Sequence, residues 1–370
     1  MKIKAFRYIT ACLLLSVFSI SACALAPGYN VIDLGTLGGT SNPSDVNDHG
    51  QVVGFSEVSY HTNHAFLWQA GAGIRDLGTL GGADSRAYGI SDSGWGVGEA
   101  RNATGSLRAF LWREGGGMMD LGTLGGDTSS ASGINALGHI AGTADTSTTS
   151  YAFLWKEGVG MTALPSEGLV SSGASAVNDL DQVVGSANFG TGTRAFFWGP
   201  GGGFTDLGTL GGDTSCAEDV NNSAQVVGTA DAVPYVAVWR AFLWQPGTSM
   251  MDLGTLGGAR SWAYGINSSG QVVGGAQNAA GYDRAFVWEP GTGMVDLNNL
   301  IDPLSGWTLT SAVAVNDSGW MVATGRVPGG NTHAVLLTPV PEPQGILLLA
   351  SGVLTVLLRR RRPMRACKGA

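Results

Sequence analysis

One seven-residue phrase, Asp-Leu-Gly-Thr-Leu-Gly-Gly, occurs five times in this chain of 370 residues. Successive copies start 42–46 residues apart when two degenerate copies are included. A constant period of this length is typical of repeat architectures, in which each repeat is one supersecondary unit. The period therefore constrains the fold more than any other feature of the sequence. The repeats start at Asp33, Asp76, Asp120, near Thr162, and at Asp206, Asp252 and Asp296.

Each repeat contains four short apolar segments. In one repeat they are Ala131–Asn135, His139–Gly142, Tyr151–Trp155 and Met161–Leu164, separated by turns rich in Gly and polar residues. Short runs with β-branched and aromatic residues, bounded by such turns, predict β-strands. The 59 Gly and the low charged fraction of 13% also suit strands joined by tight turns. We therefore expect an all-β fold with four strands per repeat.

A second phrase, Asn-x-x-Gly-Gln-Val-Val-Gly, recurs with substitutions in all seven repeats. An Asn side chain can start a turn, and a Gly can take the left-handed conformation that closes a tight hairpin. The phrase therefore predicts a hairpin between the first two strands. Its first copy, within Asp45 to Gly50, also resembles a calcium loop, whose acidic ligands the other copies mostly lack. The copies begin at Asn47, Ser91, Asn135, Asn178, Asn221, Asn267 and Asn316.

The third strand of each repeat reads Ala-Phe-Leu-Trp or a close variant and is apolar on both faces. Both faces must then be covered by neighbouring sheets, as they are when blades stack around an axis. A two-layer sandwich does not explain the strict period, and a β-helix does not need four strands per repeat. We expect the Trp residues to pack in the core rather than form a sugar-stacking ring. The strand ends at Trp68, Trp112, Trp155, Trp198, Trp244, Trp288 and, in the seventh repeat, Leu337.

The chain enters the repeats in a fourth strand, near Val31 to Leu34, and leaves them in a third strand, His333 to Leu337. Pairing these two strands completes a last four-stranded blade. We therefore predict a seven-bladed β-propeller over residues 25–340, closed by this clasp. Stretches such as His64-Ala65-Phe66 make the repeats resemble the HAF family of bacterial extracellular repeats, over roughly residues 31–338. This resemblance implies an extracellular location.

A basic residue opens most third strands, and an Asp twelve residues later closes the fourth strand. Both are lost together in the degenerate repeat, where Tyr151 replaces the basic residue. A hairpin brings these ends together, which predicts cross-strand ion pairs that fix the register. A ring of groups for an anionic or sugar ligand is the alternative. The pairs are His64–Asp76, Arg108–Asp120, Arg194–Asp206, Arg240–Asp252, Arg284–Asp296 and, across the clasp, His333–Asp33.

Both ends of the chain resemble targeting signals. Residues 1–24 combine three basic residues, an apolar stretch and Ala22-Cys23-Ala24, which predicts a secretory signal peptide, with a lipidated Cys23 as the alternative. Residues 341–370 contain an apolar run at 345–358 that lies between a Pro-Glu-Pro motif and an arginine cluster. This order resembles the PEP-CTERM sorting signal of Gram-negative bacteria. The residues are Val340, Pro341, Glu342 and Pro343, then Arg359, Arg360, Arg361 and Arg362.

In that family, an exosortase in the inner membrane recognises the signal and removes it. The resemblance therefore implies transient processing by an exosortase and a final location at the cell surface or outside the cell. The apolar run of 14 residues is short for a permanent membrane span. The arginines are expected on the cytoplasmic side, where they halt export. An ordinary C-terminal membrane anchor is the alternative.

The body between the two ends is acidic. Residues 25–340 hold 11 basic and 27 acidic residues, a net charge of −16. Such a surface repels phosphate backbones, which argues against a nucleic-acid partner. Cys216 is the one cysteine of this body, and we expect a buried thiol rather than a nucleophile.

No catalytic or cofactor motif is recognisable in the sequence. The five His residues show no metal-ligand spacing, no Gly-x-Ser-x-Gly occurs, and no long helix follows the Gly-rich phrases. We expect no cofactor and a non-catalytic binding or structural role, linked to exopolysaccharide or another envelope component. The partner is expected on the face that carries the loops between strands two and three. The alternative is an extracellular glycan-active hydrolase or lyase with carboxylates in the channel, sought first at Met161–Gly173 and Asn298–Ser311.

Overall fold

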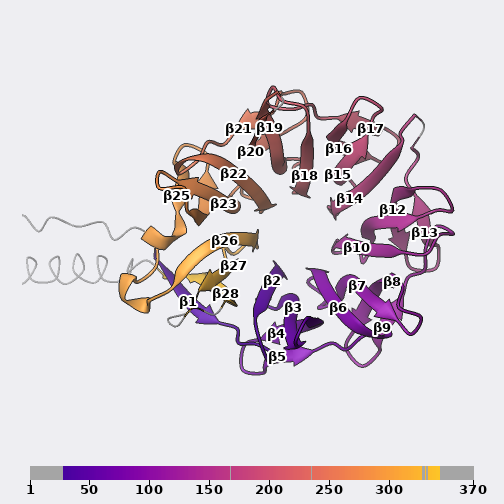
Figure 1. Ribbon diagram of the computed structural model, residues 1–370, viewed down its shortest axis with the longest axis horizontal. Coiled ribbons are helices and arrows are strands. Elements are labelled where there is room, and N and C mark those ends of the chain that lie inside the picture. The colour runs from indigo at the N-terminus through magenta and orange to yellow at the C-terminus, as the bar shows by residue number, and fades with distance from the viewer. Residues whose placement is uncertain (1–27, 167, 235, 327–329, 331, 342–370) are drawn as a thin grey trace, which may run out of the picture.

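The computed structural model describes residues 28–341 apart from 167, 235, 327–329 and 331. This part forms seven four-stranded antiparallel sheets, arranged as blades around a central axis (Figure 1). The predicted seven-bladed, all-β propeller is therefore confirmed. The expected leader and nearly all of the expected sorting signal lie outside the described residues. Within them, no helix has both the length and the apolar character needed to cross a membrane.

In the first six blades the strands follow one another outward, with the first strand at the axis (Figure 1). Blades one to three are β2 (Ser41–Val46), β3 (Val52–Ser59), β4 (Thr62–Gln69), β5 (Gly73–Asp76); β6 (Gly81–Ile90), β7 (Gly96–Asn102), β8 (Leu107–Arg113), β9 (Gly117–Asp120); β10 (Ser129–Ile134), β11 (Ile140–Asp145), β12 (Ser150–Lys156), β13 (Gly160–Ala163). Blades four to six are β14 (Ser171–Val177), β15 (Val183–Asn188), β16 (Thr193–Gly199), β17 (Gly203–Asp206); β18 (Ser215–Val220), β19 (Val226–Val233), β20 (Val236–Trp244), β21 (Met251–Asp252); β22 (Gly257–Ile266), β23 (Val272–Asn278), β24 (Asp283–Glu289), β25 (Gly293–Asp296).

The seventh blade joins the two ends of the repeat array. It consists of β26 (Thr308–Val315), β27 (Met321–Arg326), β28 (Thr332–Pro339) and the N-terminal β1 (Tyr29–Asp33). β1 pairs antiparallel with β28 in a register that runs from Tyr29↔Pro339 to Asp33↔Val335 (Figure 1). The predicted clasp is confirmed. Two short 3-10 turns, η1 (Leu297–Asn299) and η2 (Pro303–Ser305), connect blade six to blade seven.

The hairpin turns form as their residues predict. In blade one, Asn47 Oδ1 accepts hydrogen bonds from the backbone N–H groups of His49 and Gln51, and Gly50 has a φ of +72°. Where blades four and five lack this Gly, Asp181 and Ala224 take the left-handed conformation, with φ of 57° and 58°. The turn therefore forms without Gly where the Asn is kept.

The third strands supply most of the core. Their Phe side chains are completely buried in the first six blades, and Trp68, Trp112, Trp155 and Trp244 are at most 8% exposed. Trp198 and Trp288 pack against the core and are partly buried. The expectation that these Trp residues pack in the core is confirmed. Burying a Phe side chain contributes roughly 1.5–3 kcal/mol, so the stacking of blades is the main stabilising interaction.

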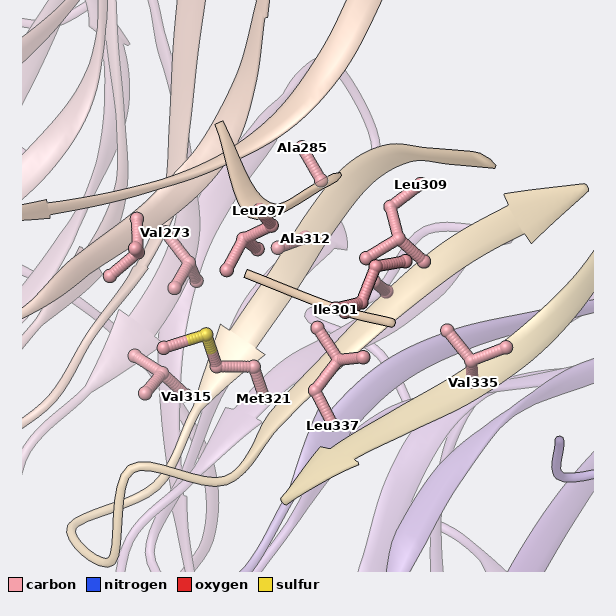
Figure 2. Close-up of a cluster of buried hydrophobic side chains, with 12 residues drawn as sticks. Val273, Ala285, Leu297, Ile301, Leu309, Ala312, Val315, Met321, Val335 and Leu337 are labelled. Carbon is pink, nitrogen blue, oxygen red and sulfur yellow. The ribbon is translucent and has the colours of Figure 1, made fainter. Parts of the chain in front are cut away.

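Each pair of neighbouring blades encloses its own apolar cluster. Figure 2 shows the cluster between blades six and seven, where Leu297 and Ile301 pack with Leu309, Met321 and Leu337. Ile301 lies in the divergent stretch Asn298–Ser311 between these blades, and Leu297 directly precedes that stretch. That stretch therefore fills the core beside the clasp, and the backbone N–H of Tyr29 donates to Leu300 O at 2.8 Å.

The repeated phrase Asp-Leu-Gly-Thr-Leu-Gly-Gly is the crossover from one blade to the next. In the second copy, Leu77 is buried and Asp76 Oδ1 accepts the backbone N–H of Gly78 at 2.7 Å. The hydroxyl of Ser85, which follows the phrase, donates to Gly78 O and accepts the N–H of Ala65 in the preceding blade. Six of the seven blade junctions use such a Ser, whereas at the junction of blades six and seven Asn298 binds the backbone N–H and C=O of Leu309 instead. The Ser residues are Ser41, Ser85, Ser129, Ser172, Ser215 and Ser261.

Candidate functional site

Four of the six predicted cross-strand pairs are present. His64 Nδ1 lies 2.7 Å from Asp76 Oδ2, and His333 Nδ1 lies 3.0 Å from Asp33 Oδ1 across the clasp. The two Arg pairs are looser, at 3.9 Å, and are Arg194–Asp206 and Arg240–Asp252. Asp76 is directly opposite Phe66 in the register, so the pair with His64 is diagonal, on one face of the sheet.

The other two predicted pairs are not formed. Arg108 and Asp120, both described, have no ion-pair contact within 4.0 Å, and Arg108 Nε is buried without a partner. Arg284 instead donates to Asp283 O and stacks over Tyr282.

The Asp residues of the crossovers have a different common role, which the sequence did not predict. In six crossovers the Asp carboxylate accepts a hydrogen bond from the backbone N–H of the residue two positions later in the chain. These Asp residues are Asp33, Asp76, Asp120, Asp206, Asp252 and Asp296.

The central channel is the feature that all seven blades build together. Its inner strands enclose two cavities, one of about 220 Å³ at the mouth formed by the hairpin turns and one of about 160 Å³ further in. Asp45, Ile134 and Val177 line both cavities, so the two meet at this level of the channel. The channel is therefore the candidate functional site.

A ring of Asn side chains joins the blades at the hairpin mouth. Each Asn that starts a hairpin donates through Nδ2 to the backbone oxygen of the equivalent residue in the next blade. The distances are 2.9–3.1 Å, and the last bond, from Asn316 to Asn47, closes the circle. Only Ser91, among these described positions, interrupts the ring because its side chain has no amide. The donors are Asn47, Asn135, Asn178, Asn221, Asn267 and Asn316.

Acidic side chains form the outer edge of the same mouth. Asp48 Oδ1 accepts the backbone N–H of Asp317, and Asp92 Oδ1 accepts that of Asp48. Burial raises the pKa of Asp48, and the charges of Asp92 and Asp317 raise it further against the lowering effect of its hydrogen bond. These carboxylates link blades and also make the mouth negative.

Two more carboxylates lie inside the channel, at a position where the other five blades have Gly or Ala. Asp45 accepts the N–H groups of Val46 and Ile90, and Asp219 accepts those of Val220 and Ile266, each at 2.8–2.9 Å. Burial raises the pKa of Asp45 to about 7 and that of Asp219 to about 6, against the lowering effect of these bonds. The charge of Asp219 also raises the pKa of Asp45. The equivalent residues are Gly89, Gly133, Ala176, Gly265 and Ala314.

The next layer of the channel is asymmetric. Burial raises the pKa of Tyr88 to about 12, as do the charge and hydrogen bond of Glu99, which accepts the Tyr88 hydroxyl at 2.8 Å. Tyr264 shows a similar rise, to about 12, from burial and from the charges of Glu218 and Asp283. The remaining walls of this layer carry small side chains. The layer consists of Ser44, Tyr88, Ser132, Ser175, Glu218, Tyr264 and Val313.

The Cys216 thiol is a hydrogen-bond partner of Glu218, which lines the channel. Burial raises the pKa of Cys216 to about 12, with further increases from the charge and hydrogen bond of Glu218. The group is therefore a thiol at neutral pH, in agreement with the expectation that it is no nucleophile. The expected burial is only partial, because Cys216 is half-buried.

The repeats thus differ from one another where side chains face the channel. Tyr88, Glu218 and Tyr264 occupy one equivalent position and line the inner cavity, whereas Arg86, Cys216 and Trp262, at the position two residues earlier, are not part of its lining. Neither set lies in Met161–Gly173 or Asn298–Ser311, where a catalytic site was to be sought first. Sequence analysis missed these positions because only the fold shows which residues of an inner strand face the axis.

The calcium-like phrase serves a structural purpose here. Both carboxylate oxygens of Asp45 bind backbone N–H groups, and Asn47 binds its own hairpin and the next blade. In the part of the chain that is described, no group of three or more His, Cys, Asp or Glu side chains is arranged to hold a metal ion.

Comparison with known proteins gives weak likenesses only. No protein-family model and no curated protein matches the chain. Among solved structures, it is similar to TolB from Acinetobacter baumannii (9% identity, 79% of this chain and 64% of TolB covered, TM-score 0.45). It is also similar to a gluconolactonase from Xanthomonas campestris (10% identity, 86% of this chain and 93% of the gluconolactonase covered, TM-score 0.43). A Trypanosoma rangeli sialidase is similar at the same level (11% identity, 90% of this chain and 61% of the sialidase covered, TM-score 0.39). The chain covers less than two thirds of the TolB and sialidase chains, and likenesses at this level assign no activity.

Proposed function

We propose that this protein is exported, sorted to the cell surface by an exosortase, and acts there as a non-catalytic propeller. Its ligand is an exopolysaccharide or another envelope component, bound in the central channel. One observation carries the binding role: the repeats share most of their crossover and turn contacts but differ where Tyr88, Glu218 and Tyr264 line the channel. Structural positions repeat because each blade needs them, whereas a ring with no ligand has no need for Tyr88, Glu218 and Tyr264 on its axis.

Two sequence features support export. Residues 1–24 have the order of charges, apolar residues and small residues of a secretory signal, and residues 341–370 resemble a PEP-CTERM signal. Replacement of Pro341, Glu342 and Pro343 by Ala is expected to leave the protein in the inner-membrane fraction with its tail intact. Appearance of that variant at the cell surface, with the normal processed mass, would contradict sorting through this motif.

A glycan array with residues 25–340, followed by sugar-release assays on the hits, tests the binding role. We expect bound glycans that are recovered intact. The alternative is a glycan-active hydrolase or lyase, and the specific observation in its favour is the set of carboxylates in the channel, Asp45, Glu218 and Asp219. Release of new reducing ends or of unsaturated sugars would establish that alternative and overturn the non-catalytic role.

A further inference from the structure

Two cavities meet at the ring of Tyr264. The first is the channel cavity of about 160 Å³, which Tyr88, Glu218 and Tyr264 help to line. The second has a volume of about 280 Å³ and is lined by Tyr264 together with Trp262, Asp283, Gly275, Thr310 and Ser311. A ligand that occupies both cavities must pass this Tyr side chain. The arrangement suits a short chain of similar units rather than one compact molecule.

Both cavities offer aromatic and hydroxyl groups to such a chain. Trp262 and Tyr264 line the second cavity, and Tyr88 and Tyr264 line the first. Sugar rings combine an apolar face, which packs on aromatic rings, with hydroxyl groups that need hydrogen-bond partners. Side chains of Ser132, Ser175, Thr310 and Ser311 in the walls can supply these partners.

The acidic side chains of the two cavities favour cationic saccharides over anionic ones. Asp45, Glu218 and Asp219 line the first and Asp283 lines the second, and no Lys, Arg or His is among the described residues that line either. Burial raises the pKa of Glu218, its hydrogen bond to the Cys216 thiol lowers it, and the charge of Asp219 raises it again. A cation beside Glu218 would offset the cost of its buried charge, whereas an anionic sugar would add to that cost.

We propose that these two cavities bind adjacent units of an amine-bearing saccharide, with an ammonium group beside Glu218 and sugar rings against Tyr264 and Trp262. The aromatic rings also attract the ammonium group through cation–π interactions. This inference rests on the proposed function, because it names the ligand class of the same channel.

Titration calorimetry of the purified full-length protein tests the inference. The probes are a β-1,4-linked glucosamine tetramer, its fully N-acetylated form, a cellotetraose and an oligomannuronate. We expect the glucosamine tetramer to bind at least tenfold more tightly than the acetylated and neutral tetramers, and the mannuronate not to bind. Glu218→Gln is expected to weaken the glucosamine tetramer at least tenfold while leaving the neutral tetramers unchanged. Trp262→Ala is expected to weaken all tetramers.

Glu114→Gln, which removes an exposed carboxylate paired with Arg75 on an outer turn, is the matched control and should bind as the wild type does. Circular dichroism and melting temperature establish that each variant is folded. Equal affinity for all tetramers with no effect of Glu218→Gln overturns the amine assignment and leaves the binding propeller standing. Tight binding followed by cleavage of the glucosamine tetramer keeps this inference and overturns the non-catalytic function. No binding of any tetramer overturns the inference.

Discussion

Asp45 and Asp219, two of the carboxylates inside the channel, predict that this protein becomes less stable as the pH rises from 5 to 8. The pKa of Asp45 rises from 3.8 to about 7 on folding, and that of Asp219 rises from 3.8 to about 6. Since a shift of one pKa unit corresponds to about 1.4 kcal/mol, the shifts of Asp45 and Asp219 correspond to on the order of 4 and 3 kcal/mol of unfolding free energy. The folded state binds the extra protons, so this stability is present below pH 4. It is lost as the pH rises through 6 and 7.

Urea denaturation followed by Trp fluorescence measures this effect at pH 5, 6, 7 and 8. The wild type should lose several kcal/mol of unfolding free energy across the series, while a double variant, Asp45→Asn with Asp219→Asn, should lose much less. Each Asn also loses one acceptor for a backbone N–H, so the variant should be less stable at pH 5. The slope with pH is therefore the informative quantity. Asp127→Asn, at an exposed carboxylate, should keep the wild-type slope.

Groups with lowered pKa do not interfere in this range. Hydrogen bonds from Ser150 and Thr128 lower the pKa of Asp145, and the stability it contributes is lost only as the pH falls below 4. A flat wild-type profile between pH 5 and 8 would refute the reasoning. So would a double variant that retains the full wild-type slope.

Three further predictions follow from single positions. Ser91→Asn should complete the ring of amides by donating to Asn135 O, and should raise the unfolding free energy by about 0.5–1.5 kcal/mol; a loss of stability in urea would contradict this. Phe153→Ala, at a completely buried side chain, should cost about 3–5 kcal/mol, whereas Val159→Ala, at a position 74% exposed, should stay within about 0.5 kcal/mol. Cys216, with its pKa raised to about 12, should react with iodoacetamide at pH 7.5 far more slowly in the folded protein than in urea, and equal rates would refute its protonated state.

Periodicity was sufficient to predict the blades, because each blade depends on local patterns. Apolar third strands, Asn turns and Gly-rich crossovers all lie within one period. The count of strand types then required β1 to complete the blade of β28, and this pairing is observed. The ion pairs were only partly predictable, since register places His64 near Asp76 but does not decide the rotamer of Arg108.

The channel could not be predicted in the same way. The amide of Asn178 meets a backbone oxygen 43 positions further along the chain, and Asn316 meets one 269 positions away. Tyr88 and Tyr264 come from blades two and six, which are not neighbours, and line one cavity because the blades form a ring. Aligning the repeats shows that these positions differ, but the closed fold is needed to show that they face the axis.

A single cross-link tests the closed ring most directly. Asn30 and Thr338 are register partners in β1 and β28, so cysteines at these positions in a variant without other cysteines should form an intramolecular disulfide. Mass spectrometry of the digested, oxidised monomer should recover the peptide that joins residues 30 and 338, and oxidation should raise the melting temperature. Free thiols, or disulfides found only between molecules, would contradict a ring closed by the first and last strands.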